Sequence, residues 1–161
     1  MNQLSLHPNL QAIFDLWSPE AMPEALSRPV AGEFLDNVFV AETTLNAPPV
    51  RIAKAGQSLR ELFGDKIQGL DLLSVFSPQD RILVWTLMRT VSIRSQPGLL
   101  RLHVLQPDGA VPADLALAPL GGAGQRYLGF FQMPFAVQRE GLAFEVVSVH
   151  PPQSQQPSSG R

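Results

Sequence analysis

The clearest hydrophobic pattern along the chain lies near its N-terminus. Large apolar residues recur there at the i, i+3, i+4 and i+7 spacing that places side chains on one helix face. They are Leu10, Ile13, Phe14 and Trp17. Pro8 suits the first helical position, because its missing N–H needs no partner there. The pattern predicts a helix over residues 8–17, within an N-terminal helical cap over residues 1–36.

The rest of the chain alternates between strand and helix patterns. Ser77 and Pro78 give the strongest helix start, because serine caps a helix and proline fits its first turn. The expected helices are 58–63, 71–75 and 78–93, the last with Ile82, Trp85, Leu87 and Met88 facing the core. The expected strands are 37–44, 50–55, 99–106, 111–118 and 125–133, with 142–149 as a candidate further strand.

The pair Asp108-Gly109 marks a tight hairpin, since both residues tolerate positive φ. A two-residue turn at this pair would place His103 opposite Asp114. Side chains alternate between the faces of a sheet. One face then carries Leu102, Val104, Ala113, Leu115, Leu117, Tyr127, Gly129 and Phe131. The other carries Arg101, His103, Leu105, Asp114, Ala116, Leu128 and Phe130.

The second of these faces is too apolar to lie bare in water. The N-terminal apolar stripe has the right size to cover it, in the same chain or in a dimer partner. The sequence leaves these two arrangements open. The candidate interface therefore comprises Leu10, Ile13, Phe14, Trp17, Leu105, Leu128 and Phe130.

Composition narrows the classes of function. A chain of 161 residues suits one domain with one core. Its 14 acidic and 12 basic residues create no strong field for nucleic acid or an anionic membrane. The absence of cysteine excludes disulfides, thiolate zinc sites and thiol catalysis. With no signal-peptide pattern and no long apolar run, we expect a cytoplasmic protein without a membrane span. The polar tail, residues 150–161, is expected to be disordered.

Candidate chemistry is sparse. The expected pair of His103 and Asp114 would stabilise the sheet by about 0.2–1 kcal/mol. Catalysis there would need a nucleophile, and neither strand offers a serine or threonine. Asp80 is explained by a helix cap and Arg81 by a surface pair. We therefore expect no enzyme activity, no catalytic residue and no metal site.

The order of motifs resembles that of a PAS domain. The resemblance rests on Phe63-Gly64 with Gly69, on Val75-Phe76-Ser77-Pro78-Gln79-Asp80-Arg81, on Gln106-Pro107-Asp108-Gly109 and on Leu128-Gly129-Phe130-Phe131. Upstream, Trp17, Asn37-Val38-Phe39-Val40, Arg51-Ile52-Ala53-Lys54-Ala55-Gly56 and Leu59-Arg60-Glu61-Leu62-Phe63-Gly64 are similar to small, single-domain, cytoplasmic PAS proteins of alphaproteobacteria. The resemblance covers about residues 17–133.

This resemblance implies an α+β fold, in which helices cover one face of a five-stranded antiparallel sheet and form a cup. The PAS core would span residues 37–149. Flavin photochemistry in PAS domains uses a cysteine and haem binding uses a histidine on the helix before the third strand. The chain has no cysteine, and residues 78–93 contain no histidine. We therefore expect no cofactor.

The cup would hold a small apolar ligand or be fully packed, and helical and strand periodicity alone favours the packed core. Its candidate lining is Phe63, Phe76, Trp85, Met88, Leu102, Val104, Leu117, Tyr127 and Phe131. The resemblance implies a stand-alone sensor or interaction module in bacterial signalling rather than an enzyme. It would contact an unidentified signalling protein and form a homodimer. The alternatives are a structural adaptor, or a small-molecule carrier or enzyme of another α+β cup fold.

Overall fold

The computed structural model describes residues 36–44, 47–120, 126–133 and 143–152. Its strands are β1 (Val38–Thr44), β2 (Ala47–Ala55), β3 (Gly98–Gln106), β4 (Gly109–Pro119), β5 (Arg126–Gln132) and β6 (Ala143–His150). Between β2 and β3 lie α4 (Gln57–Phe63), η1 (Asp65–Ile67), η2 (Leu72–Val75) and α5 (Pro78–Arg94). The expected N-terminal helix lies outside the described residues, as does the chain beyond residue 152.

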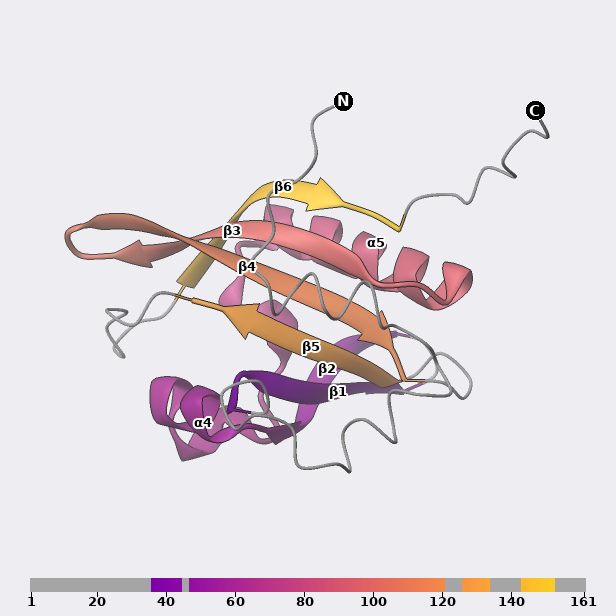
Figure 1. Ribbon diagram of the computed structural model, residues 1–161, viewed down its shortest axis with the longest axis horizontal. Coiled ribbons are helices and arrows are strands. Elements are labelled where there is room, and N and C mark those ends of the chain that lie inside the picture. The colour runs from indigo at the N-terminus through magenta and orange to yellow at the C-terminus, as the bar shows by residue number, and fades with distance from the viewer. Residues whose placement is uncertain (1–35, 45–46, 121–125, 134–142, 153–161) are drawn as a thin grey trace, which may run out of the picture.

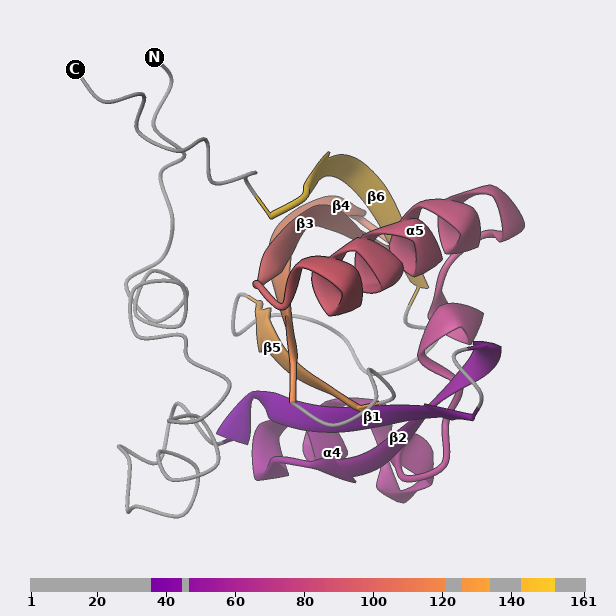
Figure 2. The ribbon, with the colours of Figure 1, turned by 90° about the vertical axis from the view of Figure 1, so that its right-hand side faces the viewer.

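The strands form one antiparallel sheet in the order β2-β1-β5-β4-β3-β6. The sheet curves, so that β3 and β4 lie beside α5 while β1 and β2 lie nearer α4 (Figure 1, Figure 2). This architecture confirms the expected α+β fold. The sheet has six strands rather than five, because the candidate further strand forms β6 and pairs with β3.

The hairpin between β3 and β4 has a different register from the one that the sequence predicts. Gln106 pairs with Gly109, so that the turn consists of Pro107 and Asp108. Proline lacks the N–H that a ladder position needs, and its fixed φ suits the first central position of a turn. The expected pairing of His103 with Asp114 is therefore wrong.

In the observed register His103 lies opposite Pro112, and Arg101 lies opposite Asp114. The Nε atom of Arg101 is 3.7 Å from the Oδ1 atom of Asp114. The shift between the expected and the observed pairing is two residues. Because side chains alternate with a period of two, every residue keeps the face that the sequence predicts for it.

Helix α5 begins where its capping signal predicts. The Oγ atom of Ser77 accepts a hydrogen bond from the backbone N–H of Asp80 at 3.3 Å, and Pro78 occupies the first turn. The buried side of the helix consists of Val84, Leu87, Met88 and Val91. The expectation that Ile82 faces the core is wrong, because Ile82 is 69% exposed.

Two side chains of the first turn of α5 fasten it to neighbouring elements. The Oδ2 atom of Asp80 accepts from the backbone N–H of Val146 in β6 at 3.0 Å. The Nε atom of Arg81 donates to the carbonyl oxygens of Leu73 and Phe76, both at 2.9 Å. The expected surface pair for Arg81 is therefore replaced by bonds to the backbone around η2.

Candidate ligand-binding core and outer sheet face

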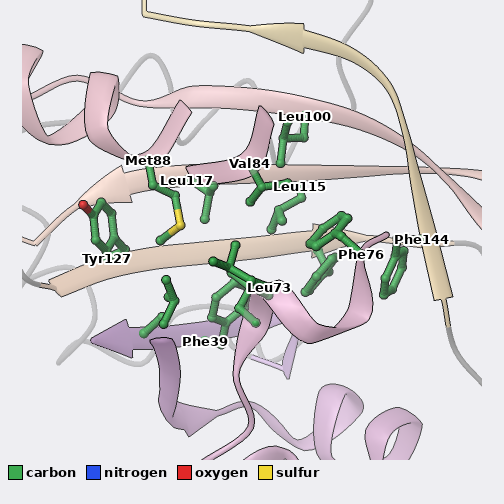
Figure 3. Packing of buried hydrophobic residues seen from close by; sticks show 14 of the residues in the cluster. Phe39, Leu73, Phe76, Val84, Met88, Leu100, Leu115, Leu117, Tyr127 and Phe144 are labelled. Carbon is green, nitrogen blue, oxygen red and sulfur yellow. The ribbon is translucent and has the colours of Figure 1, made fainter. Parts of the chain in front are cut away.

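The residues expected to line the cup all belong to one apolar cluster. This cluster, the inner core, fills the space between the concave face of the sheet and the helices (Figure 3). Phe63 and Trp85 are partly buried at its margin. The fully buried candidates are Phe76, Met88, Leu102, Val104, Leu117, Tyr127 and Phe131. The structure thus brings all the candidate lining residues together. A ligand-binding core and a fully packed core would both require this arrangement.

Five phenylalanines form a continuous group within the inner core. The ring of Phe131 lies 5.4 Å from that of Phe39, 5.5 Å from that of Phe144 and 6.1 Å from that of Phe63, between centroids. Phe76 extends the group through Phe144 at 5.9 Å. These separations lie in the range that aromatic pairs prefer. Any apolar molecule held in this core would contact aromatic rings from strands and helices together.

Two members of this aromatic group, Phe39 and Phe144, are missing from the candidate lining that the sequence predicts. Phe39 lies in a run of four apolar residues, Val38 to Ala41, and β6 contains the adjacent Val146 and Val147. The apolar pattern therefore assigns neither ring to one face of the sheet. Phe144 faces the core from β6, where it pairs with Val104 of β3. Phe39 faces the core from β1 and pairs with Gly129 of β5.

Tyr127 supplies a polar atom within this apolar surrounding. Its side chain is 2% exposed and forms a hydrogen bond with the side chain of Ser92 on α5. Burial raises the pKa of Tyr127, an effect that the Ser92 bond and the charge of Arg89 partly oppose. At neutral pH the phenol is therefore protonated, and it ties β5 to α5.

The inner core presents mainly apolar side chains. Across the described ranges, Thr43 is the one buried residue with a polar or charged side chain outside the hydrophobic set. The neighbours of His103 in β3, Leu102 and Val104, face the core, so His103 itself faces the opposite side. No group of three or more His, Cys, Asp or Glu side chains that could hold a metal occurs in the described ranges. The chemistry of this core favours apolar molecules.

A second apolar cluster, the outer patch, lies on the opposite face of the sheet. It comprises Val38, Leu99, Ala116, Ala118, Leu128 and Phe130. Leu128 and Phe130, expected at an interface, are 2% and 1% exposed. Leu105 is 42% exposed and does not belong to the patch. The other expected interface residues, from Leu10 to Trp17, lie outside the described residues.

Comparison with known proteins assigns the family. A family model described as a PAS domain matches residues 6–132, and the chain therefore belongs to the PAS domain family. PAS domains are typically modules of sensing and signal transduction. Because the chain belongs to this family, the alternative of a different α+β cup fold no longer applies. None of the curated proteins compared with the chain matches its sequence.

Solved structures that resemble the chain include two light-oxygen-voltage proteins. One is an RNA-binding light-oxygen-voltage receptor, with 18% identity and a TM-score of 0.47 over 83% of this chain and 36% of that one. The other is a fungal LOV domain photoreceptor, with 18% identity and a TM-score of 0.44 over 71% of this chain and 90% of that one. The chain thus spans about a third of the length of the RNA-binding receptor.

In the part of the chain that the structure describes, no helix combines the length and the apolar character needed to cross a bilayer.

Proposed function

We propose that this PAS domain is a sensor or interaction module in a bacterial signalling pathway and that its output passes through protein–protein contacts at the outer patch. The outer patch itself is the observation that carries the proposal. Its apolar side chains come from four strands, β1, β3, β4 and β5. The same strands also carry the apolar side chains of the inner core.

In an antiparallel sheet with one face in water, apolar and polar residues alternate along each strand. This sheet instead carries apolar side chains on both faces, so both faces need a cover. Covering a large apolar side chain is worth about 1.5–3 kcal/mol, so a cover over Leu128 and Phe130 stabilises the fold. We propose that the N-terminal stripe from Leu10 to Trp17 provides this cover, within one chain or between two copies.

A signal would act by changing how this cover packs on the sheet. A ligand in the inner core can shift that equilibrium only if it binds the two arrangements with unequal affinity. The proposed ligand is a small apolar molecule, because the inner core offers aromatic rings and methyl groups and the hydroxyl of Tyr127 is already bonded to Ser92. A cytoplasmic location, a homodimer and a signalling protein as partner belong to the same proposal.

The proposed cover is tested by placing a charge in the stripe. Phe14→Asp and Trp17→Asp should each lower either the mass in solution, measured by light scattering, or the midpoint of chemical unfolding. Gln11→Asp is the matched control, because Gln11 lies off the stripe and should leave both quantities unchanged. Unchanged mass together with unchanged unfolding in Phe14→Asp and Trp17→Asp would overturn the proposal.

The ligand is tested separately by mass spectrometry of the purified chain. A complex measured under native conditions should release a defined small molecule when the same sample is denatured. Equal masses under the two conditions would contradict a bound ligand and favour an adaptor with a packed core. The test of the outer patch does not depend on this result.

A further inference from the structure

Helix α5 carries large apolar side chains on the side that faces away from the sheet. Ile82 and Ile93 are 69% and 75% exposed, and Leu83 is 44% exposed. The opposite side of α5 packs into the inner core against β3 and β4 (Figure 2). The helix is therefore apolar on both sides, and only one of them is used by the domain itself.

The exposed residues follow a helix-pairing pattern. Ile82, Thr86, Arg89 and Ile93 are separated by four, three and four residues, and all of them are exposed. This is the spacing of the positions that line the seam between two helices packed side by side. Leu83 widens the seam next to Thr86. The stripe formed by these five residues, the α5 stripe, has the geometry that receives a second helix.

After Asp80, the charged residues of α5 itself are all basic. Between residues 81 and 94 the sequence contains three arginines and no acidic residue. Arg89 lies within the α5 stripe and Arg94 at its C-terminal end. The nearest acidic residue in the sequence is Asp80, whose carboxylate already accepts a bond from the backbone N–H of Val146. The stripe thus has apolar residues towards its two ends, with Arg89 between them and Arg94 beside its C-terminal end.

We propose that the α5 stripe docks an amphipathic helix of a partner protein whose apolar face is bordered by glutamate or aspartate. The seam would bury Ile82 and Ile93 against apolar residues of the partner, and acidic residues of the partner would pair with Arg89 and Arg94. This surface lies on the opposite side of the sheet from the outer patch. The inference therefore does not depend on the function proposed above.

A second copy of this chain is a poorer occupant. Antiparallel pairing would place Ile82 opposite Ile93, but it would bring the two Arg89 side chains to adjoining positions. Parallel pairing would set Arg89 directly against itself. Like charges at facing positions weaken an interface, whereas acidic residues of a different helix would attract the same arginines. Because the apolar area is small, the complex is expected to be weak and transient.

The test uses two designed helical peptides with leucine at the seam positions, one flanked by glutamate and the other by lysine. Each is titrated into the full, isotope-labelled chain and followed by nuclear magnetic resonance. The glutamate peptide should bind and shift the amide signals of α5, and added salt should weaken this binding. The lysine peptide should bind at least about tenfold more weakly, equivalent to about 1.4 kcal/mol.

The double variant Ile82→Gln with Ile93→Gln should lower the affinity for the glutamate peptide by about tenfold or more. Its control is Leu105→Gln with Val147→Gln, which removes two apolar residues, 42% and 52% exposed, from the sheet. Unchanged binding in the Ile82 and Ile93 variant, equal binding of the two peptides or no binding of either would overturn the proposal. Tighter binding to phosphatidylserine vesicles than to the glutamate peptide would overturn it in favour of a membrane surface.

Discussion

The ring of Phe39 in β1 lies over Gly129, its partner residue on β5. A Cβ atom at position 129 would overlap the Phe39 ring. An aromatic ring that covers a glycine on the neighbouring strand is a recurring way to pin the register of a sheet. Here it also places the Phe39 ring 5.4 Å from that of Phe131, at the centre of the aromatic group.

Gly129→Ala should therefore destabilise the fold by about 1–3 kcal/mol, the usual cost of forcing an extra atom into a packed core. The measurement is chemical denaturation of the wild type and the variant. The control repeats the substitution in a Phe39→Leu background, where the smaller side chain leaves room and the cost should shrink. An equal cost in the two backgrounds would show that the Phe39 ring is not the obstacle.

The stability of the fold should depend on pH in the alkaline range through Tyr127. Burial raises the pKa of this tyrosine in the folded chain. The protonated phenol therefore contributes its full share to the stability of the fold below about pH 10, the ordinary tyrosine pKa. The unfolded chain releases the proton first, so stability falls as the pH rises through the folded pKa.

Tyr127 is the single tyrosine of the chain, so the ultraviolet absorbance of tyrosinate reports on it alone. The folded protein should titrate at higher pH than the denatured protein. Tyr127→Phe should remove the part of the alkaline loss of stability that this titration causes. Coincident titrations of the folded and denatured states would contradict the buried, Ser92-bonded phenol.

Asp80→Ala should detach the start of α5 from β6. The substitution removes the bond from the Val146 N–H to a carboxylate, and bonds to charged groups contribute about 1.5–3 kcal/mol. Hydrogen exchange at the Val146 amide should accelerate. Gln79→Ala changes an exposed neighbour in the same turn and serves as the control. If the Val146 amide exchanges at the wild-type rate in Asp80→Ala, the bond does not protect it.

The hairpin register can be tested by cross-linking, because the chain has no native cysteine. His103→Cys with Pro112→Cys joins positions that face each other across β3 and β4, and this pair should oxidise readily. His103→Cys with Asp114→Cys joins the positions that a turn at Asp108-Gly109 would oppose. Faster oxidation of the second pair, measured by electrophoretic mobility, would contradict the structure.

The sequence predicts the faces of this sheet better than it predicts its pairings. Leu102 and Val104 face the core as expected, although the expected hairpin register is off by two residues, because such a slip preserves the alternation. The turn itself depends on Pro107, whose preference for a turn position outweighs that of Asp108-Gly109. A local signal of this kind is easily assigned to the wrong pair of residues.

The parts that the sequence missed depend on contacts between distant segments. Phe144 becomes a core residue only because β6 pairs with β3, and the sequence of a short strand does not reveal its partner. Ile82 was expected in the core because α5 has apolar residues on both sides, which leaves the phase of its pattern ambiguous. Only packing against the sheet distinguishes the two sides.

The most direct test of the central claim is to locate the N-terminal stripe relative to the outer patch. A nitroxide attached at Gln11→Cys, beside the stripe, should broaden the signals of Leu99, Leu128 and Phe130 but not that of Ile93 on the opposite side. Mixing labelled and nitroxide-bearing chains shows whether the cover comes from the same chain or from a second copy. The absence of broadening at Leu128 and Phe130 in both samples would contradict the account.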